Sequence, residues 1–177
     1  MPISLRDNRI RRLCTDALLC VFAIMLSYLE SLLPLQLLLP LPGFRLGLAN
    51  IAVMVTFCLI SRTDAAIVSA VRILLMGLLF GSATSLCFSA LGGLFSYLTL
   101  LLLSVCGRRM SMLGVSVLCA AAHNCGQMLA AALLFDPSLL FSYLPALLLA
   151  SVLYGGAVGV LLHLALPKLR HVLARVR

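Results

Sequence analysis

Six polar residues lie inside the apolar stretches of this 177-residue chain, and their types suit the binding of a small molecule. They are Glu30, Asn50, Arg72, His123, Asn124 and Gln127. An arginine cannot discard its charge and is suited to bind carboxylate or phosphate groups. Amide and imidazole side chains add hydrogen-bond donors and acceptors. Together with Arg45, which shortly precedes Asn50, they predict a pocket for an anionic or amide-bearing ligand.

The spacing of three of these residues places them together. His123 and Gln127 are four residues apart, and Asn124 and Gln127 are three apart, so they share one face of a helix. A face with three hydrogen-bonding side chains is not expected to contact lipid. Arg72 lies ten residues beyond Arg62, which puts it roughly 15 Å into the bilayer. We expect all six groups to lie between the bilayer midplane and the outer surface.

Two interpretations of this polar cluster remain open. In the first, Arg72 forms an internal ion pair with Glu30, and the amides form hydrogen bonds that join the helices. In the second, the cluster lines a pocket that opens outward, with Arg72 as its cationic anchor. The types of residue fit both interpretations.

The composition is that of an integral membrane protein. Hydrophobic residues make up 63% of the chain, charged residues only 10%, and the mean hydropathy is +1.19. Soluble domains carry roughly 25% charged residues. We expect a single membrane domain, residues 1–177, with no soluble catalytic domain. The net charge of +8 comes from residues near span ends, which suit lipid headgroups, so we expect no nucleic-acid partner.

The apolar runs predict an all-α bundle of six transmembrane helices. We place the spans at residues 13–33, 46–60, 65–80, 83–106, 113–135 and 139–166. The second and third are shorter than the roughly 20 residues that a spanning helix needs. The sixth contains Pro145, so its start is expected to be an interfacial turn or a kink. The first run is too long for a signal peptide and is expected to remain as a span.

The basic residues predict the orientation of the bundle. With the N-terminus in the cytoplasm, eleven of the 13 lie on the cytoplasmic side: Arg6, Arg9, Arg11, Arg12, Arg62, Arg108, Arg109, Lys168, Arg170, Arg175 and Arg177. This asymmetry favours six spans with both termini inside a bacterial cytoplasmic membrane. The external segment 34–45 is rich in leucine and proline, which makes it either a lid or a loop on the membrane surface.

Several motifs of catalysis do not occur in the sequence. It contains no G-x-x-x-x-G-K-[ST], G-x-S-x-G, H-E-x-x-H or D-D-x-x-D, and its five acidic residues are not clustered to hold magnesium. The seven cysteines include no C-x-x-C and suit packing. We therefore expect no enzyme activity, cofactor or metal. Gly155 and Gly159 form a G-x-x-x-G pattern that serves either packing or contact with a partner.

Four runs of the sequence carry a resemblance to a known family. They are PGFRLGLANIAVM at 42–54, VRILLMGLLFGS at 71–82, FSALGGLFSYL at 88–98 and GVSVLCAAAHNCGQMLAA at 114–131. From residue 32 to 162 the chain resembles heptaprenyl diphosphate synthase component I, also called the Gx transporter family. The element of His123, Asn124, Gly126 and Gln127 is the most specific part.

The resemblance implies a fold and a role. The family is similar to the S components of energy-coupling-factor (ECF) transporters, six-helix proteins that capture a micronutrient in a pocket near the outer side. A separate transmembrane subunit and two ATPases then drive uptake. Partner contacts would use small residues of the first helix, where Ala17 and Ala23 are available.

The resemblance and the residues leave three functions to compare. The first is a substrate-binding subunit of an uptake transporter without its own ATPase. The second, suggested by the family name, is an accessory membrane subunit for isoprenoid, quinone or redox metabolism. The third is a small channel or proton-coupled carrier. Glu30 and His123 would be its only titratable groups at depth, and two groups make a poor proton relay.

Overall fold

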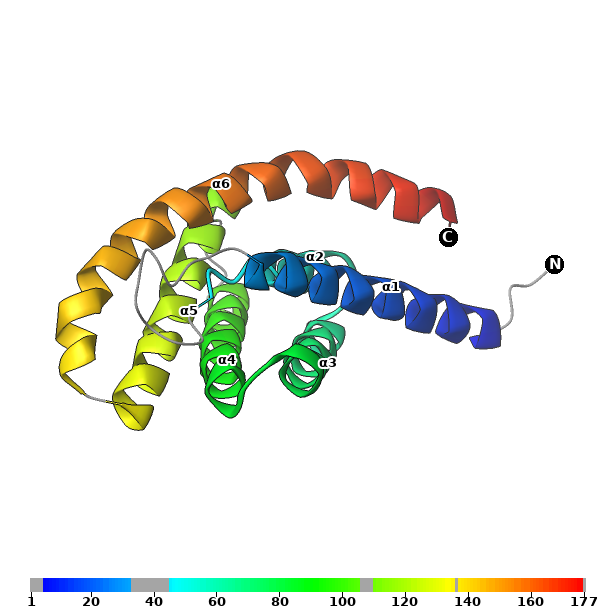
Figure 1. Cartoon of the computed structure of the whole chain (residues 1–177). Helices are drawn as coiled ribbons and strands as arrows, with labels where there is room; N and C mark the ends of the chain where they lie inside the picture. The colour runs from blue at the N-terminus through cyan, green and yellow to red at the C-terminus, as the bar shows by residue number, and fades with distance from the viewer. Residues whose placement is uncertain (1–4, 33–44, 106–109, 136, 177) are drawn as a thin grey trace.

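The computed structural model describes residues 5–32, 45–105, 110–135 and 137–176, all of them in helices or short connections. The helices are α1 (Leu5–Ser31), α2 (Asn50–Leu59), α3 (Arg62–Phe80), α4 (Ala83–Val105), α5 (Met112–Leu134) and α6 (Ser138–Val176) (Figure 1). The predicted external lid or loop, Arg108 and Arg109 fall largely outside the described residues, which include only Arg45 of the 34–45 segment.

Five of the six helices are long and apolar enough to cross a membrane. They turn leucines outward, as at Leu18, Leu78 and Leu153, each of which is more than 70% exposed. In a bilayer these side chains face lipid tails, so the chain has the helices of a multi-pass membrane protein. This confirms the all-α membrane architecture predicted from the sequence.

Helix α2 is shorter than its predicted span, whereas α1 begins eight residues before its predicted span 13–33. The prediction for α2 was 46–60, but this helix covers only Asn50–Leu59, and its 10 residues rise about 15 Å. It is surrounded by α1, α3, α4 and α6. Every residue from Ile51 to Thr56 is buried. A helix that is apolar on all sides is stable when other helices enclose it.

The starts of three long helices follow from side-chain caps. Ser61 accepts a hydrogen bond from the Asp64 N–H at the start of α3, and Ser111 accepts one from Gly114 at the start of α5. Ser82 does the same for the Ser85 N–H before α4. Each serine occupies an unpaired donor of the first helical turn. These caps explain why the predicted spans 65–80, 83–106 and 113–135 lie close to the observed helices.

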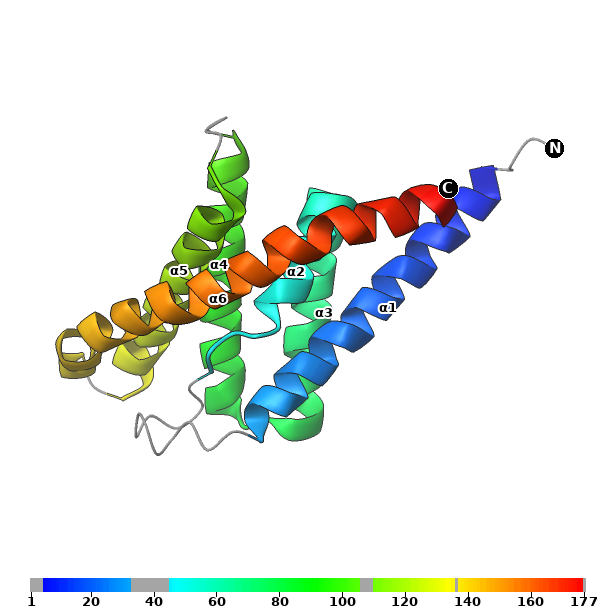
Figure 2. The ribbon, with the colours of Figure 1, turned by 90° about the horizontal axis from the view of Figure 1, so that it is seen from above.

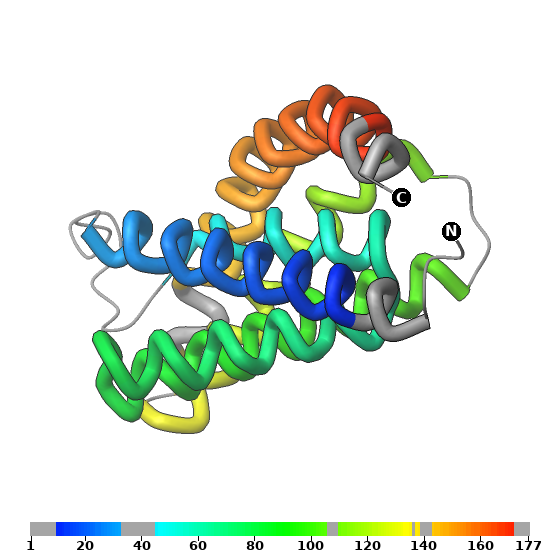
Figure 3. The backbone as a smooth tube through the Cα atoms, turned by 90° about the vertical axis from the view of Figure 1, so that its right-hand side faces the viewer, coloured from blue at the N-terminus to red at the C-terminus, as the bar shows by residue number. Residues whose placement is uncertain are grey.

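Helix α6 extends beyond the predicted span 139–166. It runs for 39 residues with Pro145 and Pro167 inside it, so neither proline ends the helix. It curves over the bundle, and Figure 3 shows it arching away from α1. In the described part of the chain, no Cα atom of α1 lies within 8 Å of a Cα atom of α6.

The two ends of the bundle are distinct. Figure 2 shows the chain termini on the same side as the α2–α3 connection, whereas the connections α3–α4 and α5–α6 lie on the opposite side. Arg170 of α6 lies near enough to Cys58 of α2 to act on it electrostatically. The termini therefore share one side of the bundle, as the distribution of basic residues predicts.

Candidate functional site

The side chain of Gln127 holds the backbone of Arg45. Its Oε1 accepts a hydrogen bond from the Arg45 N–H at 3.1 Å, and its Nε2 donates to the Arg45 carbonyl oxygen. Gln127 is fully buried on α5, 82 positions along the chain from Arg45. The amide side chain thus pairs both the backbone N–H and the backbone carbonyl of Arg45, which belongs to no helix or strand that could pair them. This contact explains why residues 45–49 can lie inside the bundle without being helical.

The carboxylate of Glu30 holds the next part of the same segment. Its two oxygens accept hydrogen bonds from the N–H groups of Gly47, at 2.6 Å, and Leu48, at 3.0 Å. Gly47 has a φ of 85°, a conformation that favours glycine. A Cβ there would also lie 3.0 Å from His123. Glu30 on α1 therefore places a negative charge beside the turn that leads into α2, where backbone N–H groups point.

His123 lies directly behind this turn. Its Nε2 is 2.6 Å from Gln127 Nε2, and it accepts the hydrogen bond if the amide nitrogen donates. The proton of a neutral imidazole then resides on Nδ1, which has no hydrogen-bond partner among the described residues. A Cβ on Gly92 of α4 would lie 2.8 Å from that nitrogen. The glycine thus gives the imidazole its space.

Arg72 is a buried cation with most of its donors unpaired. It is 3% exposed, and among the described residues its side chain makes one long hydrogen bond, of 3.4 Å from Nη1 to Ser27 Oγ. Within the described part of the chain, Nε and Nη2 have no hydrogen-bond partner. Arg72 and Glu30, both described, act on one another electrostatically but form no direct ion pair. A Cβ on Gly93 of α4 would lie 3.5 Å from Nη2 and 2.8 Å from Ile73 Cδ1, so the side chains of α3 pack directly on this glycine.

Arg45 brings a second guanidinium toward the same region. Its side chain is 9% exposed, and Nη2 donates to Ser85 Oγ on α4 at 3.0 Å. Glu30 acts electrostatically on Arg45 as well as on Arg72. The described residues thus gather two guanidinium groups and one carboxylate between α1, α3, α4 and the start of α2.

Of the other two predicted site residues, Asn124 points away from this turn and Asn50 lies beside it. Asn124 is directed at α6, where its Nδ2 donates to the Leu147 carbonyl at 3.0 Å and to Ser151 Oγ at 2.8 Å. Asn50 lines a crevice between α2, α5 and α6 with about 10 Å³ of free space, roughly one water molecule. Tyr154 also lines it, with a buried hydroxyl that has no partner among the described residues. The polar cluster is therefore divided. Asn124 binds α6, whereas the other predicted residues gather around the turn before α2: Glu30, Arg45, Asn50, Arg72, His123 and Gln127.

Three of the four predicted partner-contact residues are used inside the chain. Ala23 is fully buried and packs with Ala52 and Val68. Gly155 and Gly159 are buried against α5, where a Cβ would lie 2.8 Å and 2.6 Å from backbone atoms of Val117 and Leu113. Ala17 is exposed. The packing explains the G-x-x-x-G pattern, and a contact with a partner stays a prediction.

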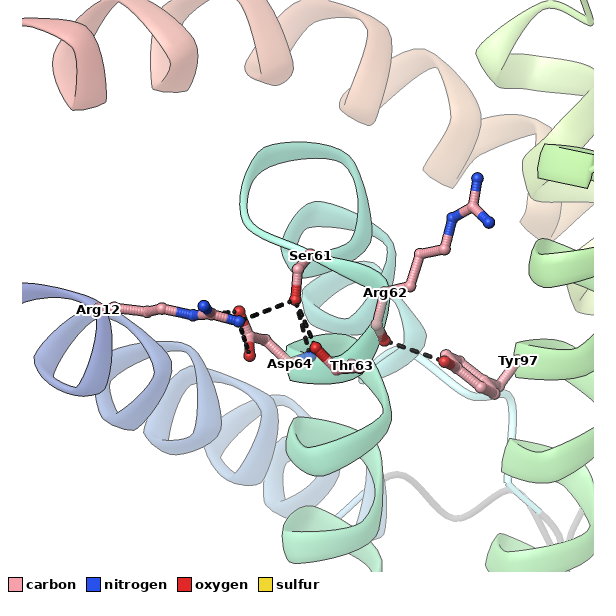
Figure 4. Close-up of polar contacts among 6 residues, drawn as sticks. All are labelled: Arg12, Ser61, Arg62, Thr63, Asp64 and Tyr97. Carbon is pink, nitrogen blue, oxygen red and sulfur yellow. Dashed lines mark hydrogen bonds and ion pairs between the residues drawn. The ribbon is translucent and has the colours of Figure 1, made fainter. Parts of the chain in front are cut away.

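Sequence reasoning missed several residues of the site and one ion pair. Ser27 lies three positions before Glu30 on α1, a helical spacing that could have identified it, whereas nothing in the sequence signals Ser85. Arg12 forms a bidentate pair with Asp64, at 2.9 and 2.7 Å, and also contacts Ser61 (Figure 4). Tyr97 donates to the Arg62 carbonyl beside it. These contacts join α1, α3 and α4 at the end that carries the termini.

Comparison with known proteins identifies the family. The family model described as heptaprenyl diphosphate synthase component I matches residues 19–165, which is most of the chain and includes every residue around the turn before α2. No curated protein and no solved structure matches the chain significantly. The match confirms the family resemblance given by the four sequence runs. The chain therefore belongs to the heptaprenyl diphosphate synthase component I family.

Proposed function

We propose that this protein is a substrate-binding membrane subunit of an uptake transporter, without an ATPase of its own, and that Arg72 anchors an anionic group of its ligand. The carrying observation is the buried guanidinium whose Nε and Nη2 have no partner among the described residues. An arginine stays charged when buried. Burial of an ion is costly unless a partner compensates it. An anionic ligand supplies that partner.

The surroundings of Arg72 favour a ligand over an internal counter-ion. Both oxygens of Glu30 accept hydrogen bonds from Gly47 and Leu48, so the carboxylate is already held by another element. Among the described residues, Arg72 donates only to Ser27, at a long distance. A carboxylate or phosphate group would pair with the free edge of Arg72.

The proposed setting follows the ECF S components that the family resembles. The protein would lie in a bacterial cytoplasmic membrane with both termini in the cytoplasm and would take its ligand from outside. A transmembrane coupling subunit and ATPases would supply the energy. Ala17, exposed on α1, is available for the contact with the coupling subunit.

An accessory membrane subunit in isoprenoid, quinone or redox metabolism is the second candidate function. The description of the family as a synthase component favours it, and so does the internal pairing of Gln127 and Asn124. On this interpretation Gln127 and Asn124 are structural. A stable complex with a membrane or soluble enzyme, and no bound small anion, would support it.

The test is to purify the protein in nanodiscs without stripping washes and to identify bound molecules by native mass spectrometry. We expect one stoichiometric anion in the wild type, lost in Arg72→Gln and retained in Arg12→Gln, a matched change at the exposed arginine of α1. Recovery of the same anion from both variants, or an empty protein that co-purifies with an enzyme, would contradict the proposed function.

A further inference from the structure

We infer that Glu30 determines ligand specificity by fixing the net charge of the Arg72 site at one positive unit, so that the site selects singly charged anions over doubly charged ones. The inference rests on the proposed function and names the class of ligand. It follows from how Glu30 is held and from which charges act on one another in the described residues.

The position of Glu30 is fixed from two sides. Its carboxylate accepts hydrogen bonds from the N–H groups of Gly47 and Leu48, and its side chain is 2% exposed. Two backbone donors, one on each oxygen, favour the ionised form of the carboxylate, which burial opposes. The turn that supplies them is itself fixed because Gln127 pairs both backbone groups of Arg45. Glu30 therefore remains near the arginines without leaving its place to bind either directly.

The charges around this position are unequal. Glu30 acts electrostatically on Arg72 and on Arg45, and the two arginines act on one another. Segment 33–44, which lies outside the described residues, contains no charged residue in the sequence. Among the described residues, two guanidinium groups and one carboxylate leave a single uncompensated positive charge at this position. One negative charge on the ligand neutralises the buried site, whereas a second would remain uncompensated.

The unpaired edge of Arg72 is where the ligand charge belongs. Arg45 already donates to Ser85, while Nε and Nη2 of Arg72 have no partner among the described residues. Arg45 and Glu30 then act on the ligand at a distance, as charges rather than as contacts. Their effect on binding is expected to depend on charge alone, which separates it from the effect of removing Arg72.

The experiment measures the affinities of acetate and sulfate for the protein in nanodiscs, by calorimetry at pH 7 and constant ionic strength. The wild type is compared with Glu30→Gln, Arg45→Gln and the double variant. Replacement of Arg45 removes only its side chain, so the backbone bonds to Gln127 remain. Adding or removing one unit charge in such a site changes the affinity for an anion on the order of tenfold for each charge that the anion carries.

We expect the wild type to bind acetate more tightly than sulfate. Glu30→Gln should shift the ratio of the two affinities about tenfold toward sulfate. The double variant should regain the wild-type ratio. Restoration by a second substitution distinguishes a charge effect from misfolding. Arg72-dependent acetate binding with a ratio that Glu30→Gln leaves unchanged would overturn this inference but leave the proposed function intact. Absence of binding by either anion in the wild type would overturn both.

Discussion

Gln127 and Arg72 are both buried, but among the described residues Gln127 is hydrogen-bonded at both of its polar atoms whereas Arg72 is not. Gln127 uses its carbonyl and amide groups on the backbone of Arg45, and its nitrogen also faces His123. Arg72 carries a charge but has two nitrogens without a partner among the described residues. A satisfied buried amide stabilises a fold, whereas an uncompensated buried cation destabilises it. Substitutions at the two positions should therefore have opposite effects on stability.

Arg72→Met should stabilise the ligand-free protein. Methionine has a similar length and no charge to desolvate, and among the described residues it removes only the long hydrogen bond to Ser27. We expect unfolding to require about 1–3 kcal/mol more free energy than in the wild type. The stabilisation by added anions should disappear. Thermal denaturation in nanodiscs with and without anion measures both effects, and a lower melting temperature without anion would show that Arg72 is paired internally.

Gln127→Met should destabilise the protein. It leaves the N–H and carbonyl groups of Arg45 buried without a partner, at a cost of about 1–3 kcal/mol for each group. Thr99→Val on α4 serves as the control, since that hydroxyl only bonds the Phe95 carbonyl of its own helix. Chemical denaturation in detergent compares them. Equal stabilities of the two variants would mean that Gln127 does not hold the Arg45 backbone.

At the scale of the elements, glycines determine how closely α4 and α5 approach. Gly126 of α5 faces Leu91 and Gly92 of α4, and a Cβ there would lie 2.7 Å from the Leu91 carbonyl carbon and 3.0 Å from the Gly92 Cα. Both are backbone atoms, which cannot move without the whole helix. The site depends on this crossing because His123 and Gln127 are on α5.

Gly126→Ala should separate α4 from α5 and lower stability by about 1–3 kcal/mol. Gly156→Ala provides a matched control in α6, since nothing lies within 4 Å of a Cβ at that position. The control should be neutral or more stable by up to about 1 kcal/mol because alanine favours helix. Melting temperatures in nanodiscs test the pair. A loss of stability in Gly156→Ala as large as in Gly126→Ala would contradict this account of the crossing.

The sequence predicts the long helices well because their signals are local. Apolar runs and capping serines mark α3, α4 and α5 within a few residues. The start of α2 cannot be predicted this way. Residues 46–49 are as apolar as a helix, but Gly47 and Leu48 bind Glu30, and Arg45 just before them binds Gln127. Likewise the residue types of the site are visible in the sequence, whereas the direction of Asn124 toward α6 is not.

At the scale of the whole molecule, the bundle has two chemically different ends. One carries the chain termini and the contacts of Arg12 with Asp64 (Figure 4). The other carries the connections α3–α4 and α5–α6 (Figure 2). The ligand site opens toward the second end in the proposed function, so the orientation of the bundle decides from which compartment a ligand is taken.

Cysteine labelling should reveal the orientation of the bundle. Thr63 at the start of α3 and Ala83 at the start of α4 are exposed and lie at opposite ends of the bundle. Each is replaced by cysteine, as Thr63→Cys and Ala83→Cys, in a protein whose native cysteines have been replaced by serine. We expect a membrane-impermeant maleimide to label Ala83→Cys in intact cells and Thr63→Cys only after the membrane is opened. Arg170→Cys, exposed near the C-terminal end, should behave like Thr63→Cys. Labelling of Thr63→Cys and Ala83→Cys from one side would contradict the bundle.

The short helix α2 also constrains how the protein is made. A segment of 10 residues is too short to halt in the membrane by itself during synthesis, so it must insert as a hairpin with α3. The polar backbone before it is paired partly by Glu30, already synthesised, and partly by Gln127, which is 82 residues away from Arg45. That backbone therefore stays incompletely paired until α5 leaves the ribosome. Assembly of the turn before α2 is consequently a late, post-insertion step of biogenesis.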